Sequence, residues 1–531
     1  MPDSNSRAYT LKGCFESSLA RNGERTALHF GGDDETLTYV DLDERSNAVA
    51  NGLVDRGVSP GERVALMLSN RVEYVVADLA IIKAGAVKVP LNDMLTPDEF
   101  EYMLADSGTS TVVAGPKFTD TLGDLRENLP ALDRFIGVTA GQSLPSGFTD
   151  FETLGAEGDT ASPPPVDVDP SDTVAHYYTG GTTGKPKGVV HSHRNMAMNT
   201  HAHAIELGIT GDDTLLLMTP LPHSAGLFLW GGLLSGATVA VRDGFEPERT
   251  LQDIETRSIS WTFMVPTMIY RLLNHADLDS ADTSTLSTLV YGAAPMTANR
   301  LEEGLAAFGP VFLQFYGQTE VPNLITTFGK QEHRHAVEAG INERLESAGQ
   351  PCLMADVKIV DYDSGNELPQ GEIGEILATA PYTMAEYFER PEKTAETLVD
   401  GWVRTGDIGR LDEEGYLYLL DRDSDVIITG GMNVYSTEVE DALDRHPDVR
   451  EVAVIGIPHP DWGEAIHAVI VSDTASLSES DIKTFADDRL ADYKKPKSVE
   501  FVDDIPKTPY GKQDKVALRD RYWEDEARDI A

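Results

Sequence analysis

The chain has 531 residues, which is long enough for two or more domains because a single hydrophobic core stops growing at roughly 250 to 300 residues. It carries 88 acidic and 43 basic residues, and its formal net charge at pH 7 is -45. The acidic residues are spread along the sequence and form no acidic tail. A field of this sign repels nucleic acid and anionic lipid, so neither is expected as a partner.

The large and dispersed negative charge also indicates a cytosol of high salt. Molar salt screens the repulsion between acidic side chains that would otherwise loosen the fold. We therefore expect a halophilic source, and an ordinary acidic cytosolic protein is the alternative.

Cysteine usage and hydropathy favour a cytoplasmic protein without a membrane span. Cys14 and Cys352 lie far apart and show no CxxC spacing, so neither a disulfide framework nor a zinc site is indicated. The N-terminal residues contain no apolar core of signal-peptide length. The least charged stretch, residues 215–241, is interrupted by prolines and glycines. It predicts a strand, a loop, a buried helix and a second strand.

From about residue 60, short β-branched runs alternate with longer helical patterns. ERVALMLS precedes the helical RVEYVVADLAIIKAGA and the strand-like VKVPL, and the same alternation returns between TLLLM and PVFLQFYG. Strands separated by helices of this length predict right-handed crossovers in parallel sheets that are covered on both faces. We therefore predict an α/β fold whose large N-terminal domain contains helix-covered, mostly parallel sheets.

The pattern changes after about residue 350. VKIVDYDSGNELPQGEIGEILATA predicts short strands joined by turns, which is typical of antiparallel hairpins or a small barrel. A new unit begins near DRDSDVIITGG, and Thr437 and Glu440 have the spacing of a capping box before VEDALDRH. We predict a large domain over residues 1–423 and a small α+β domain over residues 424–531.

A glycine and threonine loop, YYTGGTTGKPKG, occupies residues 177–188. Its backbone N–H groups, hydroxyls and small side chains suit a phosphate chain. It is not a Walker loop, because only three residues separate Gly180 from Gly184 and a proline follows Lys185. On its own it could equally be a surface turn. Three more stretches at or near predicted strand ends accompany it: YGAAP (residues 291–295), YGQTE (residues 316–320) and RTGD (residues 404–407).

In this order, the stretches resemble the superfamily of adenylate-forming enzymes, which includes acyl-CoA synthetases, firefly luciferases and peptide-synthetase adenylation domains. The resemblance extends over nearly the whole chain, through WVRTGDIGRLDEEGYLYLLDR and GGMNVYSTEVE to PKTPYGK. It implies that a carboxylate attacks the α-phosphate of Mg-ATP to give an acyl-adenylate, and that a CoA thiol then takes the acyl group and releases AMP. It also implies a mobile small domain that closes the site between the two steps.

The resemblance assigns the nucleotide site residue by residue. Gly180 stands where the family usually has a serine, so one hydroxyl contact to a phosphate is absent. Thr319 is expected at a phosphate, Asp407 at both ribose hydroxyls and Arg422 at a further nucleotide contact. Glu320 and Thr183 are the expected magnesium contacts, as a hard divalent cation seeks oxygen ligands. The remaining expected residues are Thr179, Gly180, Gly181, Thr182, Thr183 and Lys187 in the phosphate loop, Gly292, Ala293 and Ala294 along adenine, and Tyr316 and Gly317 beside them.

The resemblance also assigns the catalytic and hinge residues. Lys512 is expected to stabilise charge during attack on the α-phosphate, together with Thr183 and Glu320. His223 resembles the gate between the ATP and acyl sites, and a simple loop histidine is the alternative. The glycine pair Gly430 and Gly431 is expected to line the pantetheine tunnel. Ser424 stands where the family hinge usually has Asp or Lys.

Four histidines cluster in the sequence: His191, His193, His201 and His203. Such a cluster raises metal binding as one hypothesis. Their spacing matches no familiar zinc pattern, and His193 falls where the family begins a helix. We therefore favour a structural role.

The identity of the acid depends on the acyl pocket. The stretch HSAGLFLWGG contains no acidic residue to pair with a substrate ammonium, which disfavours an amino acid. An apolar lining favours a fatty or aromatic acid over a short polar one, and our first expectation is a medium- or long-chain fatty acid. An aryl acid, a luciferase-like oxidation and a non-catalytic acid or nucleotide sensor remain as alternatives. The expected lining residues, for which plain core packing is the alternative, are Phe228, Trp230, Tyr291, Val321 and Asn323.

The sequence ends soon after Lys512 and leaves no room for a carrier domain, so free CoA is the expected acceptor. The oligomeric state stays open between a monomer and a homodimer.

Overall fold

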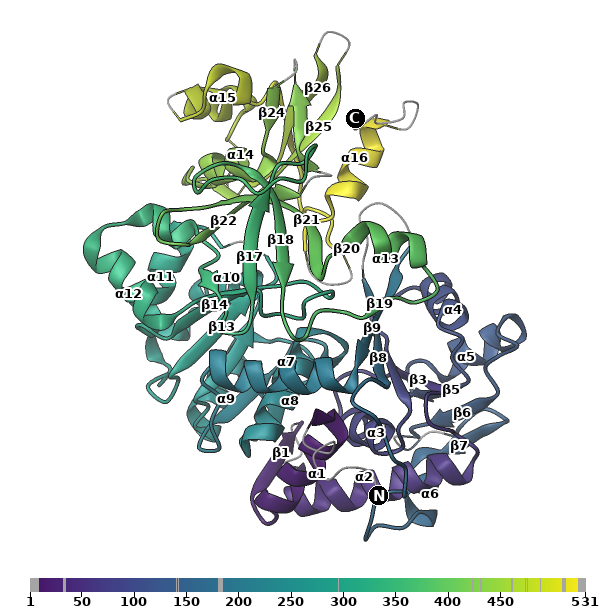
Figure 1. Ribbon diagram of the computed structural model, residues 1–531. Helices are drawn as coiled ribbons and strands as arrows, with labels where there is room; N and C mark the ends of the chain where they lie inside the picture. The colour runs from purple at the N-terminus through teal and green to yellow at the C-terminus, as the bar shows by residue number, and fades with distance from the viewer. Residues whose placement is uncertain are drawn as a thin grey trace.

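Two large sheets, with helices between and outside them, form most of the molecule, and a smaller C-terminal unit lies at one end (Figure 1). The computed structural model describes residues 9–31, 35–139, 141, 143–179, 185–294, 296–422, 425–429, 432–459, 462–472, 474, 476–487, 489–508 and 512–523. Both large sheets are mostly parallel, so the predicted α/β fold class is confirmed.

The first large sheet has nine strands, and the antiparallel ones lie at its edges. Its order is β16-β15-β14-β13-β12-β10-β11-β1-β2. In that order the strands are Gln350–Pro351, Thr326–Phe328, Phe312–Tyr316, Thr288–Gly292, Trp261–Met264, Thr214–Leu217, Thr238–Val241, Thr26–Phe30 and Glu35–Thr38.

The second large sheet has eight strands in the order β19-β9-β8-β4-β3-β5-β6-β7. Its antiparallel pairs, β19 with β9 and β9 with β8, lie at one edge. In that order the strands are Glu386–Tyr387, Lys187–Ser192, Thr173–Thr179, Val87–Pro90, Arg63–Met67, Thr111–Ala114, Arg134–Gly137 and Phe148–Asp150.

The helices form an inner layer between the two sheets and an outer layer on each. The inner helices are α1 (Leu11–Asn22), α2 (Tyr39–Asp55), α3 (Val72–Lys83), α6 (Phe151–Glu157), α7 (His193–Glu206) and α8 (Gly226–Ser235). Outside the nine-stranded sheet lie α9 (Pro247–Arg257), α10 (Pro266–Leu273), α11 (Ala298–Phe308) and α12 (Lys330–Ala339). Outside the eight-stranded sheet lie α4 (Pro97–Asp106) and α5 (Thr119–Leu125).

Strand residues alternate between the inner and outer cores. In β13, Val290 packs in the inner core, whereas Leu289 and Tyr291 pack under the outer helices. Because side chains of a strand point to opposite faces in turn, a strand covered on both faces must be apolar throughout. This explains the continuous apolar runs in the sequence.

Residues 215–241 fold as the sequence predicts. They form β10, the turn η3 (Leu221–Ala225), the buried helix α8 and β11. Among the helices of the described residues, none is long and apolar enough to cross a membrane.

A five-stranded antiparallel sheet follows the two large ones and forms the predicted small barrel-like part. The short helix α13 (Pro391–Thr397) precedes β20 in the chain. The order is β17-β18-β21-β20, and β22 pairs with β21. These strands are Asp356–Val360, Gly374–Thr379, Trp402–Leu411, Leu398–Val399 and Leu417–Arg422.

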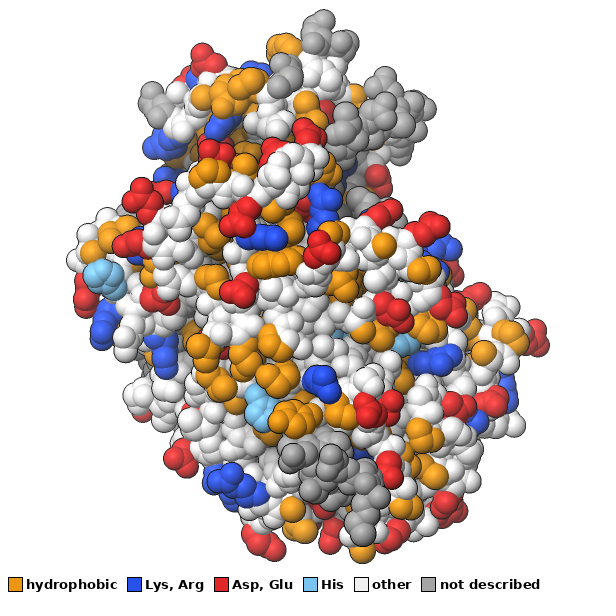
Figure 2. All heavy atoms as spheres, in the orientation of Figure 1, with side chains coloured by type: hydrophobic (Ala, Val, Ile, Leu, Met, Phe, Trp, Pro, Cys, Tyr) orange, Lys and Arg blue, Asp and Glu red, His pale blue; other side chains and the backbone are white. Residues whose placement is uncertain are grey.

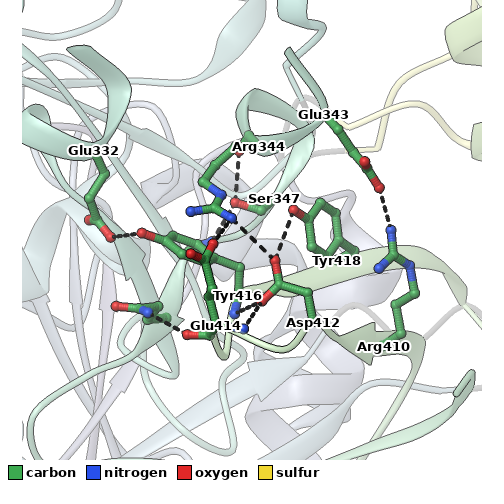
Figure 3. Close-up of polar contacts among 11 residues, drawn as sticks. Glu332, Glu343, Arg344, Ser347, Arg410, Asp412, Glu414, Tyr416 and Tyr418 are labelled. Atoms are coloured by element: carbon green, nitrogen blue, oxygen red, sulfur yellow. Dashed lines mark hydrogen bonds and ion pairs between the residues drawn. The ribbon is translucent and has the colours of Figure 1, made fainter. Parts of the chain in front are cut away.

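A polar cluster holds the turn end of the β21–β22 hairpin against the rest of the large domain (Figure 3). Arg344 pairs with Glu414, and its Nη2 lies 3.7 Å from Asp412 Oδ2. Its guanidinium carbon lies 4.0 Å from the ring centre of Tyr416, whose hydroxyl donates to Glu332 Oε1 at 3.0 Å. The cluster therefore holds the turn end of the hairpin, whereas the predicted site residues Asp407 and Arg422 pair at its other end.

The C-terminal unit has its own five-stranded sheet in the order β24-β23-β26-β25, with β27 on β26. Helices α14 and α15 pack on one face, and α16 packs on the other. The strands are Met432–Val434, Ile427–Thr429, Gly463–Ser472, Val449–His459 and Ser498–Phe501, and the helices are Ser436–Asp444, Glu479–Asp487 and Lys515–Trp523.

The predicted capping box at Thr437 and Glu440 is wrong. Helix α14 begins at Ser436, before Thr437, and its N-cap makes no side-chain hydrogen bond. The Thr437 hydroxyl donates to the carbonyl of Leu420, and Glu440 accepts from the backbone of Val454 at 2.7 Å. Contacts with other strands have replaced the local cap, and a sequence pattern alone does not reveal them.

Candidate active site

Three of the predicted motifs lie at the carboxyl ends of parallel strands, where open α/β sheets bind ligands. Thr179 ends β8, and Lys187 pairs with it as the first residue of β9. Gly292 ends β13. Tyr316 ends β14 next to it. The predicted phosphate-loop residues Gly180, Gly181, Thr182 and Thr183 lie outside the described residues.

The predicted adenine segment begins at a close approach between two strands. A Cβ on Gly292 would lie 2.5 Å from the carbonyl oxygen of Phe315, so only glycine fits there. Ala293 follows with a left-handed φ of 66°, and Ala294 continues the turn. Such strained backbone costs free energy and persists only where the surrounding structure imposes it, often at ligand sites. Ala293 is exposed, so a flat ring has access to its backbone.

The Asp407 carboxylate, on β21, is held from both sides. Its Oδ2 accepts from the Tyr316 hydroxyl at 2.6 Å and from Gln318 Nε2 at 2.7 Å. Its Oδ1 lies 3.3 Å from Arg422 Nε, on the neighbouring β22. Burial and Asp407 raise the pKa of Tyr316 well above its usual value, so this phenol donates at neutral pH. The carboxylate therefore has a fixed orientation before any nucleotide arrives.

The turn after β14 folds back on itself. A Cβ on Gly317 would lie 2.3 Å from the carbonyl carbon of Asn323, so the close approach again requires glycine. Asn323 has a left-handed φ of 61°. The carbonyl of Thr319 accepts from Nε2 of the buried His191 at 2.9 Å. The YGQTE motif is therefore held by tertiary contacts as well as by its own backbone.

Glu320 lies beside two further residues that could act on a phosphate chain. Its Oε1 accepts from the Tyr387 hydroxyl at 2.5 Å. The ring of Tyr387 lies 5.0 Å from Lys187 Nζ. Burial and Glu320 raise the pKa of Tyr387, so the phenol remains a donor.

The donor set at Glu320 fits magnesium held together with a nucleotide. Among the described residues, no three His, Cys, Asp or Glu side chains form a metal site. Magnesium is usually held by one or two carboxylates and by substrate phosphates, so Glu320 supplies a sufficient protein ligand. Thr183, the other expected magnesium contact, lies outside the described residues.

Lys512 reaches this site from the C-terminal unit. The residue keeps solvent access, and its ammonium interacts with the charges of Arg422 and Asp407. Partial loss of hydration and the charge of Arg422 lower the pKa of Lys512 to about 8, although Asp407 opposes the shift. Burial, reinforced by Lys512, lowers the pKa of His223 to about 3, so this histidine is neutral. The structure thus brings four predicted residues from distant parts of the chain together.

The turn that carries His223 is held by an asparagine that the sequence analysis missed. His223 has a non-helical backbone (φ −115°, ψ −149°) inside η3. Asn70 Nδ2 donates to the carbonyl of Thr219 at 2.8 Å, and Asn70 Oδ1 accepts from the backbone of Leu221 at 2.8 Å. The side chain of Asn70 therefore replaces backbone partners at an irregular turn.

The predicted pocket residues do not all come together. Phe228 and Val321 are fully buried in the inner core, where Phe228 packs 4.8 Å from the ring of Phe263. Trp230 is also buried, but Nε1 donates to Asp78 at 2.8 Å on another face of α8. Tyr291 points to the outer core, where its hydroxyl bonds to a histidine of α12. Tyr291 therefore lies apart from Phe228.

Asn323 takes part in a chain of hydrogen bonds next to Phe228. Ser224 Oγ donates to Asn323 Oδ1 at 2.9 Å, and Asn323 Nδ2 donates to His203 Nε2 at 3.1 Å. His203 Nδ1 donates to the carbonyl of Asn199 at 2.8 Å. Burial lowers the pKa of His203 to about 4, so the ring stays in this neutral tautomer. These hydrogen bonds hold the polar side chain of Asn323 next to the apolar inner core.

Three of the four clustered histidines have separate hydrogen-bond partners. His191 bonds to Thr319, and His203 bonds to Asn323. His201 Nδ1 lies 2.7 Å from the carbonyl of Ala197. His193 is the first residue of α7, as the sequence predicts. His191, His201 and His203 therefore serve hydrogen bonds of the fold, whereas both ring nitrogens of the buried His193 lack a hydrogen-bond partner among the described residues.

Comparison with known proteins identifies this arrangement. Residues 15–388 match the family described as AMP-binding enzyme, and residues 438–512 match the AMP-binding enzyme C-terminal domain. The chain belongs to the AMP-binding enzyme family.

Similar proteins of this family include ligases for different acids. A feruloyl-CoA synthase from an Amycolatopsis species is 38% identical over 94% of this chain and 96% of its own length. The medium/long-chain-fatty-acid–CoA ligase FadD8 of Mycobacterium tuberculosis is 34% identical over 97% of this chain and 90% of its own. ATP-bound MatB from Rhodopseudomonas palustris is 32% identical and has a TM-score of 0.86, covering 96% of this chain and 99% of that structure.

The predicted membership of the adenylate-forming superfamily is therefore confirmed. The chain is an adenylate-forming ligase of the AMP-binding enzyme family, and ATP is its nucleotide substrate. The buried and oriented Asp407, the exposed Ala293 backbone and the neighbouring Lys512 fit a nucleotide between the two domains.

Several residues at this site escaped the sequence analysis. Gln318 belongs to the YGQTE motif, so its place in the sequence is a local signal for a role at this site. Tyr387 lies 67 residues from Glu320 in sequence, and Asn70 lies 151 residues from Leu221. Contacts over such separations leave no local pattern, so only the folded chain reveals them.

Proposed function

We propose that this ligase activates an apolar carboxylic acid with Mg-ATP to an acyl-adenylate and then transfers the acyl group to CoA. The observation that carries the proposal is the position of Lys512 among Asp407, Arg422 and His223. An ammonium group in that position stabilises negative charge that develops when a carboxylate attacks the α-phosphate. In this arrangement the enzyme is ready for the first of the two steps.

The protein groups have separate tasks in that step. The two oxygens of Asp407 accept the ribose hydroxyls, and Tyr316 and Gln318 hold the carboxylate in place. The hydroxyl of Thr319 and the ammonium of Lys187 bind phosphate oxygens. Magnesium, when bound through Glu320 and Thr183, neutralises charge on the triphosphate. His223, neutral and half-buried, separates the nucleotide from the acyl site.

The second step requires the C-terminal unit to move. We propose residues 1–423 and 424–531 as the two moving parts, with the hinge at Ser424. Gly430 and Gly431 would then line the path of the pantetheine arm. Ser424, Gly430 and Gly431 lie outside the described residues. Free CoA as acceptor and a reducing cytoplasm as location belong to the same proposal.

The acid that we favour is a medium- or long-chain fatty acid. Phe228 and Val321 are fully buried apolar side chains of the same core cluster as Leu221 and Ala225, so the core beside the His223 turn is apolar. No acidic residue stands in residues 223–232 to pair with an ammonium group.

An aryl acid is the second candidate, and a specific observation favours it. Ser224 donates to Asn323, Asn323 donates to His203, and the ring of His203 lies 5.5 Å from that of Phe228. An acid with a ring hydroxyl or methoxy group could bond to Asn323 or Ser224, whereas a plain alkyl chain offers no such partner.

The test is acid-dependent exchange of pyrophosphate into ATP in molar potassium chloride. The panel contains short, medium and long fatty acids, together with benzoic and cinnamic acids with and without a ring hydroxyl. We expect a selective response to fatty acids of medium or long chain, followed by CoA-dependent release of AMP. A response confined to hydroxylated aryl acids would establish the second candidate.

The controls separate the two steps. Exchange without any CoA-dependent AMP release would confirm adenylation and contradict CoA as the acceptor. No response to any acid, in protein whose unfolding is cooperative, would contradict the proposed acid classes.

A further inference from the structure

Tyr387 lies between two charged residues that the proposed mechanism directs toward the triphosphate. It belongs to the short strand β19, which pairs with β9 through Val189. The side chain is almost fully buried. Lys187 begins β9, two residues before Val189. The strand pairing therefore brings Tyr387 close to the end of the predicted phosphate loop.

The first contact of Tyr387 is with the side chain of Glu320. The hydroxyl donates to Oε1 at 2.5 Å, which is the usual length for an O–H donor and a charged oxygen acceptor. The backbone N–H of Met384, three residues earlier, donates to the carbonyl of Glu320 at 2.8 Å. The segment before and within β19 thus holds both the main chain and the side chain of Glu320.

The bond to Oε1 leaves the other carboxylate oxygen in a defined direction. Among the described residues, Tyr387 is the only side chain that bonds to the Glu320 carboxylate. A carboxylate with one oxygen fixed cannot rotate freely, so Oε2 needs little ordering before it binds a cation.

The second contact of Tyr387 is with Lys187. The ammonium nitrogen lies 5.0 Å from the ring centre, which is within the range of a cation–π interaction. The long side chain of a lysine otherwise samples many rotamers. The ring of Tyr387 therefore limits the rotamers of Lys187, and the hydroxyl of the same residue limits the rotation of the Glu320 carboxylate.

We propose that Tyr387 is a positioning residue of the nucleotide site, which orients Glu320 through its hydroxyl and Lys187 through its ring. This inference rests on the proposed function, because it takes Glu320 as the magnesium ligand and Lys187 as a phosphate contact. It goes further by assigning both orientations to one side chain that touches neither metal nor phosphate.

Two substitutions separate the two contacts. Tyr387→Phe removes the hydroxyl and keeps the ring under Lys187. Tyr387→Leu removes both. The matched control is Tyr416→Phe, because Tyr416 also donates to a glutamate and also carries a cation, Arg344, over its ring, at the end of the β21–β22 hairpin opposite to the Asp407–Arg422 pair. This control measures what the loss of such a buried hydrogen bond does to the protein in general.

The measurement is ATP binding by titration calorimetry in full-length protein, without magnesium and over a range of magnesium concentrations. We expect Tyr387→Phe to raise the magnesium concentration needed for half-maximal enhancement of ATP binding about ten-fold, the effect typical of losing a partner of a metal ligand. ATP binding without magnesium should stay unchanged. Tyr387→Leu should also weaken binding without magnesium, by roughly three-fold, because the cation–π contact is lost. Tyr416→Phe should change neither quantity.

The magnesium dependence of ATP binding in Glu320→Gln separates a failure of the proposed magnesium ligand from a failure of the inference about Tyr387. If the wild type and Glu320→Gln show the same magnesium dependence, the proposed magnesium ligand is wrong, and the inference about Tyr387 falls with it. If Glu320→Gln loses the dependence but Tyr387→Phe keeps it, only the inference is overturned. In the double variant, Tyr387→Phe should have no further effect on magnesium dependence, because it acts through Glu320.

The thermal unfolding midpoints complete the test. Each phenylalanine variant loses one buried bond to a carboxylate, so we expect Tyr387→Phe and Tyr416→Phe to unfold at similar temperatures. A Tyr387→Phe protein that fails to fold while Tyr416→Phe folds would show a structural role for Tyr387 and would overturn the proposal.

Discussion

At the scale of single residues, Lys512 shows how two distant segments create a chemical property. A lysine on a free surface loses its proton near pH 10.4. Partial loss of hydration and the charge of Arg422 lower the pKa of Lys512 to about 8, although the Asp407 carboxylate opposes this shift. The group is therefore charged at neutral pH but loses its charge within an accessible range of pH.

The adenylation rate should fall as pH rises through about 8, because the neutral amine no longer stabilises the negative charge at the α-phosphate. The measurement is pyrophosphate exchange from pH 6 to pH 10 at saturating ATP and acid. Lys512→Ala should reduce exchange about a thousandfold and remove this decline. As a control, Lys483→Ala changes an exposed lysine of α15 and should retain the wild-type profile. A rate for Lys512→Ala equal to that of the wild type would contradict the catalytic assignment.

At the scale of elements, α8 joins two halves of the large domain. Phe228 and Trp230 are two residues apart on this helix, so they point about 200° apart around its axis. Phe228 packs against the nine-stranded sheet. Trp230 packs toward the eight-stranded sheet, where Lys88 of β4 lies 3.9 Å from its ring and 2.9 Å from Asp78 of α3. A buried ion pair therefore links β4, α3 and α8.

Removing the cation from this pair should destabilise the large domain. Both side chains of the pair are 1% exposed, so Lys88→Met leaves the Asp78 carboxylate buried without its counter-ion. We expect the free energy of unfolding to fall by about 3 to 5 kcal/mol, measured by guanidinium unfolding followed through tryptophan fluorescence. Adding Asp78→Asn should restore much of the loss, because no buried charge then remains. Lys483→Met, at an exposed ion pair, should change it by less than about 0.5 kcal/mol. An equal effect of the two lysine variants would contradict this role for the pair.

At the scale of the whole molecule, repulsion between acidic residues acts on the surface and between the two domains. Acidic side chains are scattered over the visible face in Figure 2. At the domain contact, burial and the acids Glu346, Glu440 and Asp444 raise the pKa of Asp441 to about 7. A raised pKa means that this arrangement binds a proton more tightly, so it gains stability as pH falls through about 7. Arg445, 3.0 Å from Glu346, compensates only part of this charge.

Lowering the salt concentration should therefore destabilise the protein. Between 1 M and 0.1 M salt the screening length grows from about 3 Å to about 10 Å, so acidic residues repel over longer distances. We expect the thermal unfolding midpoint to fall by more than roughly 5 °C over this range. Tetramethylammonium chloride of equal ionic strength should support the midpoint as well as potassium chloride does, if screening is the cause. A midpoint that does not change with salt would favour the alternative of an ordinary acidic cytosolic protein.

The amino-acid sequence alone predicted the fold class correctly, and it named most of the residues proposed for the nucleotide site. Strands and helices can be predicted from the spacing of their apolar residues, because each element buries particular faces against a core. The elements between Glu62 and Tyr316 follow such patterns. Glycine requirements are also local, since Gly292 and Gly317 permit close approaches that a Cβ would block. Asp407, Glu320 and Lys512 could be named in advance because their motifs resemble those of a known family.

Which side chains lie in contact depends on the packing of the folded chain. Tyr387 and Asn70 bond to residues that are distant in sequence. Tyr291 and Trp230 point to faces of their elements that no local pattern specifies. The capping box at Thr437 failed for the same reason, because Leu420 from another strand competes for its hydroxyl. A periodic pattern fixes which face of an element is buried, whereas the partner on that face depends on how the whole chain packs.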